Sequence, residues 1–333
     1  MNTAITQIEY YLPDKILNNL ELEHRFPDWN ASKIEEKIGI RERRIAADNE
    51  TALDLAYQAS KKILQRIDKD SIDFILLCTQ SPDYFLPTSA CILQDMLGLK
   101  TTVGALDFNL GCSGFVYGLA LAKGLINAGI ASQVLLVTAE TYSKHIHPED
   151  RGNLSIFGDG AAATLISKTE CEKILEFDFG TDGKGMNNLI VPNGSLRNRF
   201  EPSENVGLDE GGNFRVNNHL FMNGPEIFNF TIESVPLVVK NVLQKNNMVL
   251  EKIDYVIFHQ ANKYMLNYLR KKIKIPKEKF YNNMLFTGNT VSATIPIALK
   301  DCLDNKIVKS GDKILLIGFG VGYSWGGTII EIE

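Results

Sequence analysis

The stretch Asp107–Gly124, DFNLGCSGFVYGLALAKG, joins an apolar run to a helical pattern through a turn of small residues. Apolar side chains recur at helical spacing from Phe115 to Leu125, so we expect a strand, a turn at Gly111–Gly114 and a helix. Cys112 would then sit at a helix N-terminus, where unpaired amides and the dipole lower a thiol pKa. Small neighbours leave room for a substrate, so Cys112 is a candidate nucleophile, with a buried structural cysteine as the alternative.

Composition restricts the class of protein. The chain has 333 residues, of which 44% are hydrophobic, enough for one large or two coupled domains. A net charge of −5 argues against a nucleic-acid binder, and five irregularly spaced cysteines suggest neither a disulfide framework nor a zinc site. The chain begins without a signal-peptide pattern and has no apolar stretch of about 18 residues, so we expect a cytoplasmic protein without a membrane partner.

Hydrophobic patterns predict alternating strands and helices. The expected strands are Ile5–Tyr11, Ile72–Thr79, Val103–Phe108, Gln133–Thr138, Ile174–Phe179 and Leu189–Pro192. The expected helices are Asn18–Arg25, Trp29–Lys37, Thr51–Ile67, Thr88–Leu99 and Pro225–Asn246. Residues 168–224 mix short strands with loops rich in Gly and Asn, and their path is not traced from the sequence.

The second half of the chain repeats the first. IDYVIF (253–258) echoes IDFILL (72–77) at an offset of 181, and KILLI (313–317) echoes QVLLV (133–137) at an offset of 180. SATIPIAL (292–299) falls 179 residues after SGFVYGLA (113–120). Such a period is too long for a solenoid. It predicts two copies of an α/β unit, residues 1–170 and residues 171–333, with helices on both faces of each sheet.

Two stretches of the second copy lie where strands meet helices. They are Phe258–Asn262 (FHQAN) and Thr287–Ser292 (TGNTVS). Because ligands collect at the carboxyl ends of strands, two facing copies would bring Cys112, His259 and Asn289 into one pocket. A Cys with a His and an Asn fits nucleophilic acyl transfer. Alone, His259 would be a core histidine and Asn289 a turn residue, but their matching positions in a duplication favour a site.

Eight motifs, in this order and spacing, carry a resemblance that covers essentially the whole chain. They are GIRERRIA (39–46), LPTSAC (86–91), GCSGF (111–115), PEDRG (148–152), FGDGA (157–161), HQAN (259–262), GNTVSA (288–293) and GFGVGYSWG (318–326). The chain resembles the thiolase superfamily, and within it the β-ketoacyl-acyl-carrier-protein synthase III group. The resemblance implies an α/β fold of five layers, αβαβα, built from two duplicated halves, and a homodimer.

The resemblance also implies a reaction in two steps that initiates fatty acid biosynthesis. Cys112 takes an acyl group from acyl-CoA, and malonyl-acyl carrier protein then loses CO₂ and attacks the thioester to give 3-oxoacyl-acyl carrier protein. His259 and Asn289 would donate hydrogen bonds to the enolate, and the backbone amides of Cys112 and Val321 would hold the tetrahedral oxyanion. Coenzyme A enters as the thioester substrate, and neither a cofactor nor a metal is implied.

Further positions match the binding residues of the group. The implied coenzyme A contacts are Trp29 and Arg151 at the adenine, Lys37 at a phosphate, Phe228 in the channel and Asn262 near the pantetheine. The basic residues that would dock the acidic carrier protein are Lys263, Arg270, Lys271 and Lys272.

Four features depart from the group's usual pattern. The segment Trp29–Gly39 is longer than in housekeeping enzymes, Tyr264 replaces an Arg, and Val321 replaces a Gly. Leu86 stands where a Phe often closes the acyl pocket across the dimer interface, so we expect primers longer or bulkier than acetyl.

Three other functions compete with condensation. One is an acyltransferase of a specialised pathway, which passes the acyl group to an amine, a hydroxyl or a β-keto acceptor. Another is a subunit without catalytic activity, which the presence of Cys112, His259 and Asn289 together argues against. The third is a thiolase, which fits less well because Cys302 lies inside the helix after Asn289, where the second catalytic Cys of a thiolase is not expected.

Overall fold

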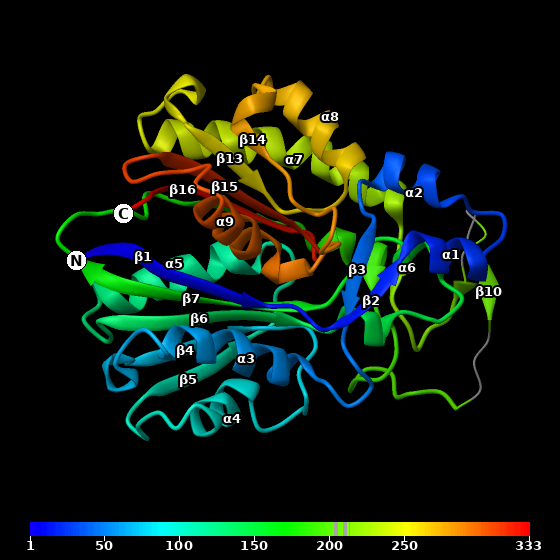
Figure 1. The fold of residues 1–333 in the computed structure, drawn as a ribbon, viewed down its shortest axis with the longest axis horizontal. Coiled ribbons are helices and arrows are strands. Elements are labelled where there is room, and N and C mark those ends of the chain that lie inside the picture. The colour runs from blue at the N-terminus through cyan, green and yellow to red at the C-terminus, as the bar shows by residue number, and fades with distance from the viewer. Residues whose placement is uncertain (203–205, 209–211, 213) are drawn as a thin grey trace.

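Two five-stranded sheets, with helices between and outside them, form the core of the protein (Figure 1). The computed structural model describes residues 1–202, 206–208, 212 and 214–333. Each sheet is mixed, and the parallel strands in its centre are the continuous apolar runs of the sequence, as expected for strands buried on both faces.

The first sheet draws its strands from the first half of the chain. In spatial order they are β1 (Asn2–Tyr11), β7 (Gly160–Thr169), β6 (Gln133–Glu140), β4 (Phe74–Cys78) and β5 (Gly104–Phe108). The pairs β4–β5 and β4–β6 are parallel, and the pairs β6–β7 and β7–β1 are antiparallel. Strand β5 therefore forms one edge of this sheet.

The second sheet repeats this arrangement. In the matching spatial order its strands are β8 (Asp178–Thr181), β16 (Ser324–Glu331), β15 (Lys313–Gly320), β13 (Tyr255–Phe258) and β14 (Phe280–Tyr281). The parallel pairs are β13–β14 and β13–β15, and the other two pairs are antiparallel. Strands β13 and β15 thus hold the places of β4 and β6, as the offset of about 180 residues predicts.

Helices complete five layers and confirm the predicted fold class (Figure 1). The helices between the sheets are α5 (Gly114–Asn127) and α9 (Thr294–Asp304). Those outside the first sheet are α3 (Ala52–Leu64) and α4 (Ser89–Met96), and those outside the second are α7 (Gly224–Lys245) and α8 (Lys263–Ile273). The central layer buries Phe115, Leu119, Ile295 and Leu299 in one cluster. A division of the chain between residues 170 and 171 stays a prediction.

Smaller elements gather at the right-hand end of the view in Figure 1. They include β2 (Lys15–Asn18), α1 (Asn19–Arg25), α2 (Ala31–Ile38), β3 (Glu42–Ile45), α6 (Arg151–Leu154) and β10 (Gly207–Leu208). The remaining short strands are β9 (Leu189–Ile190), β11 (Phe214–Arg215) and β12 (Phe221–Met222). The Asn30 side chain caps α2 by accepting from the Lys33 amide at 3.1 Å, and Gly39 ends it with φ of +78°.

One predicted strand begins later than expected. The predicted strand Ile174–Phe179 is wrong at its start, because β8 begins at Asp178 and Ile174 forms only an isolated bridge with Ile330.

Of the helices in the described ranges, none is both long enough and apolar enough to cross a membrane.

Candidate active site

Cys112 lies on the turn between β5 and α5, as the motif predicts. The Gly114 amide donates to the Gly111 carbonyl at 2.8 Å and closes this turn. The Cys112 side chain is 5% exposed. Gly320, the last residue of β15, packs beside it, and a Cβ at Gly320 would lie 2.9 Å from the sulfur. A glycine at this position therefore keeps the space next to the sulfur open.

The predicted lowering of the Cys112 pKa is wrong. Burial, together with the neighbouring Glu140 carboxyl, raises the pKa of the Cys112 thiol to about 12. Hydrogen bonds from the backbone amides of Cys112 and Val321 oppose this rise. Loss of hydration and a nearby negative charge thus outweigh the field of the α5 N-terminus. The two amides that reach the sulfur are the pair that the family resemblance implies for the oxyanion.

Glu140, the last residue of β6, is a fully buried carboxyl near the nucleophile. It accepts hydrogen bonds from the Gln80 amide at 3.0 Å and from the hydroxyls of Ser81 at 3.2 Å and Ser292 at 2.8 Å. Glu140 thus connects the loop after β4, which holds Gln80 and Ser81, with Ser292 in the segment before α9. Burial raises the pKa of Glu140 to about 8, so the carboxyl is protonated at neutral pH and ionised at higher pH.

We expect the substitution Glu140→Gln to speed alkylation of Cys112 at alkaline pH only. At alkaline pH the ionised Glu140 carboxylate raises the pKa of the Cys112 thiol, so removal of its charge lowers that pKa. Well below pH 8 the wild-type carboxyl is neutral, so wild type and variant should be alkylated at the same rate. One unit of pKa changes the thiolate fraction about tenfold, and we expect modification by iodoacetamide to be roughly three to ten times faster near pH 9.

Alkylation is followed by mass on the peptide that contains Cys112, because exposed Cys91 and Cys171 also react. Glu176→Gln, at an exposed position, is the matched control. Equal rates for Glu140→Gln and wild type across the alkaline range would contradict the influence of Glu140 on the thiol.

His259 follows β13 and is 2% exposed. Burial lowers the pKa of the imidazole to about 3, against the effect of a hydrogen bond with the Val291 backbone, so the ring is neutral near pH 7. Nδ1 lies 2.7 Å from the Thr294 hydroxyl oxygen, and that hydroxyl donates to the Val291 carbonyl at 3.0 Å. The hydroxyl has one proton, so its bond to the Val291 carbonyl goes together with a proton on Nδ1 and a lone pair on Nε2.

Asn289 is held by backbone bonds to the first half of the chain. Its amide donates to the Ile156 carbonyl at 2.9 Å, and its carbonyl accepts from the Gly158 amide at 3.0 Å. In the side chain, Oδ1 accepts from the Val291 amide at 2.9 Å, and Nδ2 lies 3.5 Å from Nε2 of His259. The Asn289 side chain is therefore oriented with its donor group toward His259.

The turn that carries Asn289 rests on Arg43, whose side chain is fully buried. The guanidinium donates to the Ser155 carbonyl from Nε at 2.9 Å and to Oδ1 of Asn19 from Nη1 at 2.5 Å. Gly288 has φ of +69°, and a Cβ there would lie 3.0 Å from Cγ of Arg43. A glycine suits this combination of left-handed conformation and close approach.

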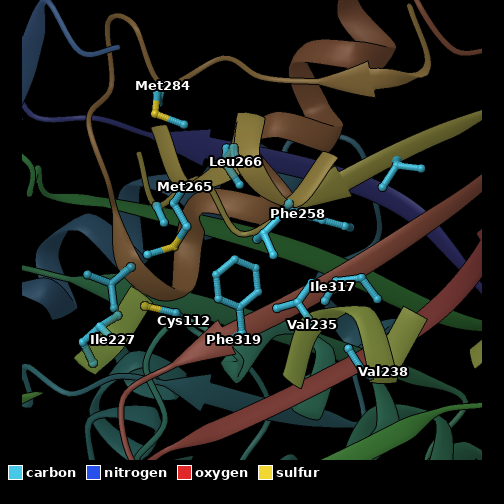
Figure 2. Close-up of a cluster of buried hydrophobic side chains, with 14 of the residues drawn as sticks. Cys112, Ile227, Val235, Val238, Phe258, Met265, Leu266, Met284, Ile317 and Phe319 are labelled. Atoms are coloured by element: carbon cyan, nitrogen blue, oxygen red, sulfur yellow. The ribbon is translucent and has the colours of Figure 1, made fainter. Parts of the chain in front are cut away.

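Phe319 connects the Cys112 turn to the histidine. The rings of Phe319 and His259 meet edge to face, with centroids 5.6 Å apart. Cys112, Phe258 and Phe319 belong to one buried hydrophobic cluster (Figure 2). The fold thus gathers the three predicted catalytic residues, with Asn289 beside His259 and Cys112 in the cluster that packs against the imidazole.

The predicted coenzyme A contacts lie on α2, α6, α7 and the start of α8, with Trp29 just before α2. The Arg151 guanidinium stands 5.5 Å from the centre of the Trp29 ring, and Lys37 is exposed in the last turn of α2. Asn262 caps α8 by accepting from the Met265 amide at 2.9 Å. The cap occupies the side-chain oxygen, so a ligand here would meet the amide nitrogen of Asn262.

The predicted docking residues lie on two sides of α8. Lys263, Arg270 and Lys271 line a hollow of about 620 Å³ that also includes residues of α2 and β14. Lys272 instead reaches α7, where its Nζ donates to the Ile232 carbonyl at 2.7 Å. The four cations therefore do not form a single patch.

Two of the residues that depart from the family pattern are strongly exposed. Leu86 is 83% exposed, and its neighbours Tyr84 and Phe85 are exposed as well. Tyr264, at 65% exposure, projects from α8 with its ring 5.6 Å from that of Phe228.

Within the described ranges, no group of three or more His, Cys, Asp or Glu side chains is placed to hold a metal ion.

Sequence reasoning missed Glu140, Thr294 and Arg43. A signal existed for Glu140, because a carboxyl ends the otherwise apolar run QVLLVTAE. No comparable signal marked Thr294, since Thr is common near helix starts, or Arg43, since Arg is almost always exposed.

Comparisons with known proteins agree in sequence and in fold. A family model described as 3-oxoacyl-[acyl-carrier-protein (ACP)] synthase III matches residues 106–183, and the model of its C-terminal part matches residues 243–332. The chain is 38% identical over 334 residues to the beta-ketoacyl-[acyl-carrier-protein] synthase III of Clostridium perfringens, and 99% of each chain is covered.

Solved structures extend this likeness to three dimensions. A crystal structure of a 3-oxoacyl-(acyl-carrier-protein) synthase III matches with a TM-score of 0.98, 49% identity and coverage of 100% of both chains. The 3-oxoacyl-(acyl-carrier protein) synthase from Burkholderia xenovorans LB400 matches with a TM-score of 0.92 and 35% identity, covering 100% of this chain and 94% of that one.

Proposed function

Because the chain belongs to the 3-oxoacyl-[acyl-carrier-protein] synthase III family, we propose that it starts fatty acid biosynthesis by condensing an acyl group from acyl-CoA with malonyl-acyl carrier protein. One observation carries the assignment of roles. The Cys112 sulfur receives hydrogen bonds from two backbone amides in a buried site that also holds His259 and Asn289.

In the first half-reaction, Nε2 of His259 takes the Cys112 thiol proton while the sulfur attacks the thioester carbon of acyl-CoA. Because the resting thiol and imidazole are both neutral, proton transfer accompanies the attack. The amides of Cys112 and Val321 donate to the tetrahedral oxyanion. The bond from carbon to the CoA sulfur then breaks, and CoA leaves as a thiol with the proton from His259.

In the second half-reaction, the carboxylate of malonyl-acyl carrier protein leaves as CO₂, and its electron pair forms an enolate. Nδ2 of Asn289 donates to the enolate oxygen, since the Val291 amide already occupies Oδ1. The enolate carbon attacks the acyl thioester, the bond to the Cys112 sulfur breaks, and the sulfur takes a proton from water. A donor role for His259 at the enolate requires a proton on Nε2, and it stays a prediction.

Coenzyme A and the carrier protein would enter over α2 and α8. An adenine ring would stack at Trp29 and Arg151, which must move apart from their present contact at 5.5 Å to take a ring between them. Lys263 and Lys271 line the hollow beside α8, where positive charge favours an acidic carrier protein. The Phe228 and Tyr264 rings would lie along the pantetheine arm.

We further propose a homodimer formed at the edge of the first sheet. Leu106 on β5 is exposed, and so are Phe85 and Leu86. An apolar strand edge is prone to unwanted association unless it is covered, and a second copy of this chain would cover it. Leu86 would then face the acyl pocket of the partner, where its smaller side chain leaves more room than a Phe.

The test of the proposed function is to supply acyl-CoA with malonyl-acyl carrier protein and to measure CO₂ release and product mass together. We expect equal amounts of CO₂ and 3-oxoacyl-acyl carrier protein. Transfer of the acyl group to an amine, hydroxyl or β-keto acceptor without CO₂ would instead establish the specialised acyltransferase.

A further inference from the structure

We propose that Ser113 and Ser324 are positioning residues for acylation. The hydrogen bond between their hydroxyls, here called the serine clamp, holds the Val321 amide against the Cys112 sulfur. This inference rests on the proposed role of that amide at the oxyanion. Both serines are buried, and their side-chain oxygens lie 2.6 Å apart.

The serine clamp joins segments from the two halves of the chain. Ser113 directly follows the nucleophile at the start of α5, and Ser324 is the first residue of β16. The loop between β15 and β16 carries the Val321 amide, and Ser324 pairs with Gly320 where this loop begins and ends. Because the two proposed oxyanion amides come from these two segments, their spacing depends on how firmly the segments are held together.

The hydrogen bonds of the serine clamp have a direction. The Ser324 hydroxyl donates to the Val321 carbonyl at 3.0 Å, so Ser324 closes the loop in which Val321 lies. A hydroxyl has one proton, so this bond goes together with donation from the Ser113 hydroxyl to the Ser324 oxygen. The Cys112 sulfur receives the Val321 amide, which completes a closed circuit of contacts back to Ser113, the next residue in the chain.

Local geometry favours this contact over the usual one for a serine at a helix start. At the N-cap a serine hydroxyl usually accepts from an amide of the first helical turn. Within the described ranges, the Ser113 side chain caps no amide of α5 and bonds to Ser324 instead. Strand β15 also packs directly on this residue, since a Cβ at Gly318 would lie 2.8 Å from the Cα of Ser113. The Ser113 hydroxyl therefore serves the contact between the two halves.

The position of the Val321 amide matters for the chemistry of Cys112. During acylation the thioester oxygen gains negative charge, and the two backbone amides stabilise it fully only if both point at it. The Val321 amide also opposes the rise in the Cys112 thiol pKa, because it donates to the sulfur. Loss of its alignment should therefore slow acylation and leave less thiolate at alkaline pH.

The test compares Ser324→Ala, Ser113→Ala and the double variant in two assays. Single-turnover acylation by acyl-CoA is followed by intact mass. Alkylation by iodoacetamide near pH 9 is followed by mass on the peptide that contains Cys112. Thr328→Val is the matched control, because Thr328 is fully buried on the same strand as Ser324 and its hydroxyl donates to the Leu175 carbonyl.

For Ser324→Ala we expect acylation to slow roughly ten- to fiftyfold, less than for complete loss of an oxyanion donor, and the KM for acyl-CoA to stay near its wild-type value. Ser113→Ala keeps the bond from Ser324 to Val321 and should slow acylation roughly three- to tenfold. The double variant should match Ser324→Ala, because that change already removes the serine clamp. Alkylation of Ser324→Ala should slow about threefold, and Thr328→Val should match wild type in both assays.

Acylation of Ser324→Ala within about twofold of wild type overturns the inference, and so does a double variant slowed by the product of the two single effects. Faster alkylation of Ser324→Ala also overturns it, since general loosening of the site would expose the thiol. The alkylation assay needs no acyl-CoA and therefore tests the serine clamp separately. Absence of acylation in the wild type refutes the proposed function itself.

Discussion

The variant Cys112→Ser is expected to take up no acyl group from acyl-CoA, where the wild type gains one acyl mass per chain. The Cys112 sulfur is hydrogen-bonded by the backbone amides of Cys112 and Val321, the pair proposed to hold the oxyanion. A serine hydroxyl is a far weaker nucleophile than a cysteine thiol, so the loss should be complete on the scale of the assay.

Intact mass after incubation with acyl-CoA measures this adduct directly. Cys171→Ser, which removes an exposed thiol, should acylate like the wild type. An adduct that persists in Cys112→Ser would place the acylation site on another residue and would remove the basis of the proposed mechanism.

Asn289→Ala is expected to separate the two half-reactions. Its amide is proposed to donate to the enolate, so CO₂ release from malonyl-acyl carrier protein should fall about 10²–10³-fold, the usual effect of removing one such donor. Acylation of Cys112 should continue, since Nε2 of His259 keeps its lone pair without Asn289.

The comparison with His259→Ala sharpens this result. The donor roles at the enolate that the family resemblance implies would leave acylation intact in both variants. The acceptor role proposed for Nε2 predicts instead that His259→Ala loses both half-reactions. Asn305→Ala, at the exposed end of α9, is the control and should retain both. Near-normal CO₂ release by Asn289→Ala would refute its assigned role, and normal acylation by His259→Ala would refute the acceptor role of His259.

Local pattern determined most of the architecture. Continuous apolar runs marked β4, β6, β13 and β15, because strands buried on both faces leave no room for polar residues. The repeat at an offset of about 180 residues predicted the second sheet. The least regular region, residues 168–224, was predicted least well, since its short strands carry no periodic signal.

The identity of the candidate site also came from the sequence. Cys112 and His259 follow the strands β5 and β13 of the two copies, and Asn289 precedes the helix that corresponds to the one after Cys112. The small residues next to the nucleophile in the chain, Gly111, Ser113 and Gly114, mark the space that the substrate needs. These relations follow from residue type and spacing alone.

The protonation states at the site were decided by tertiary structure alone. The sequence shows that Cys112 lies just before the N-terminus of a helix. The burial and the Glu140 carboxyl that raise the pKa of the Cys112 thiol come from other segments of the chain. The tautomer of His259 likewise depends on Thr294, which lies 35 positions away and contacts the ring only after folding. Desolvation and hydrogen-bond direction are properties of a three-dimensional environment, whereas periodicity and motif spacing are properties of the chain.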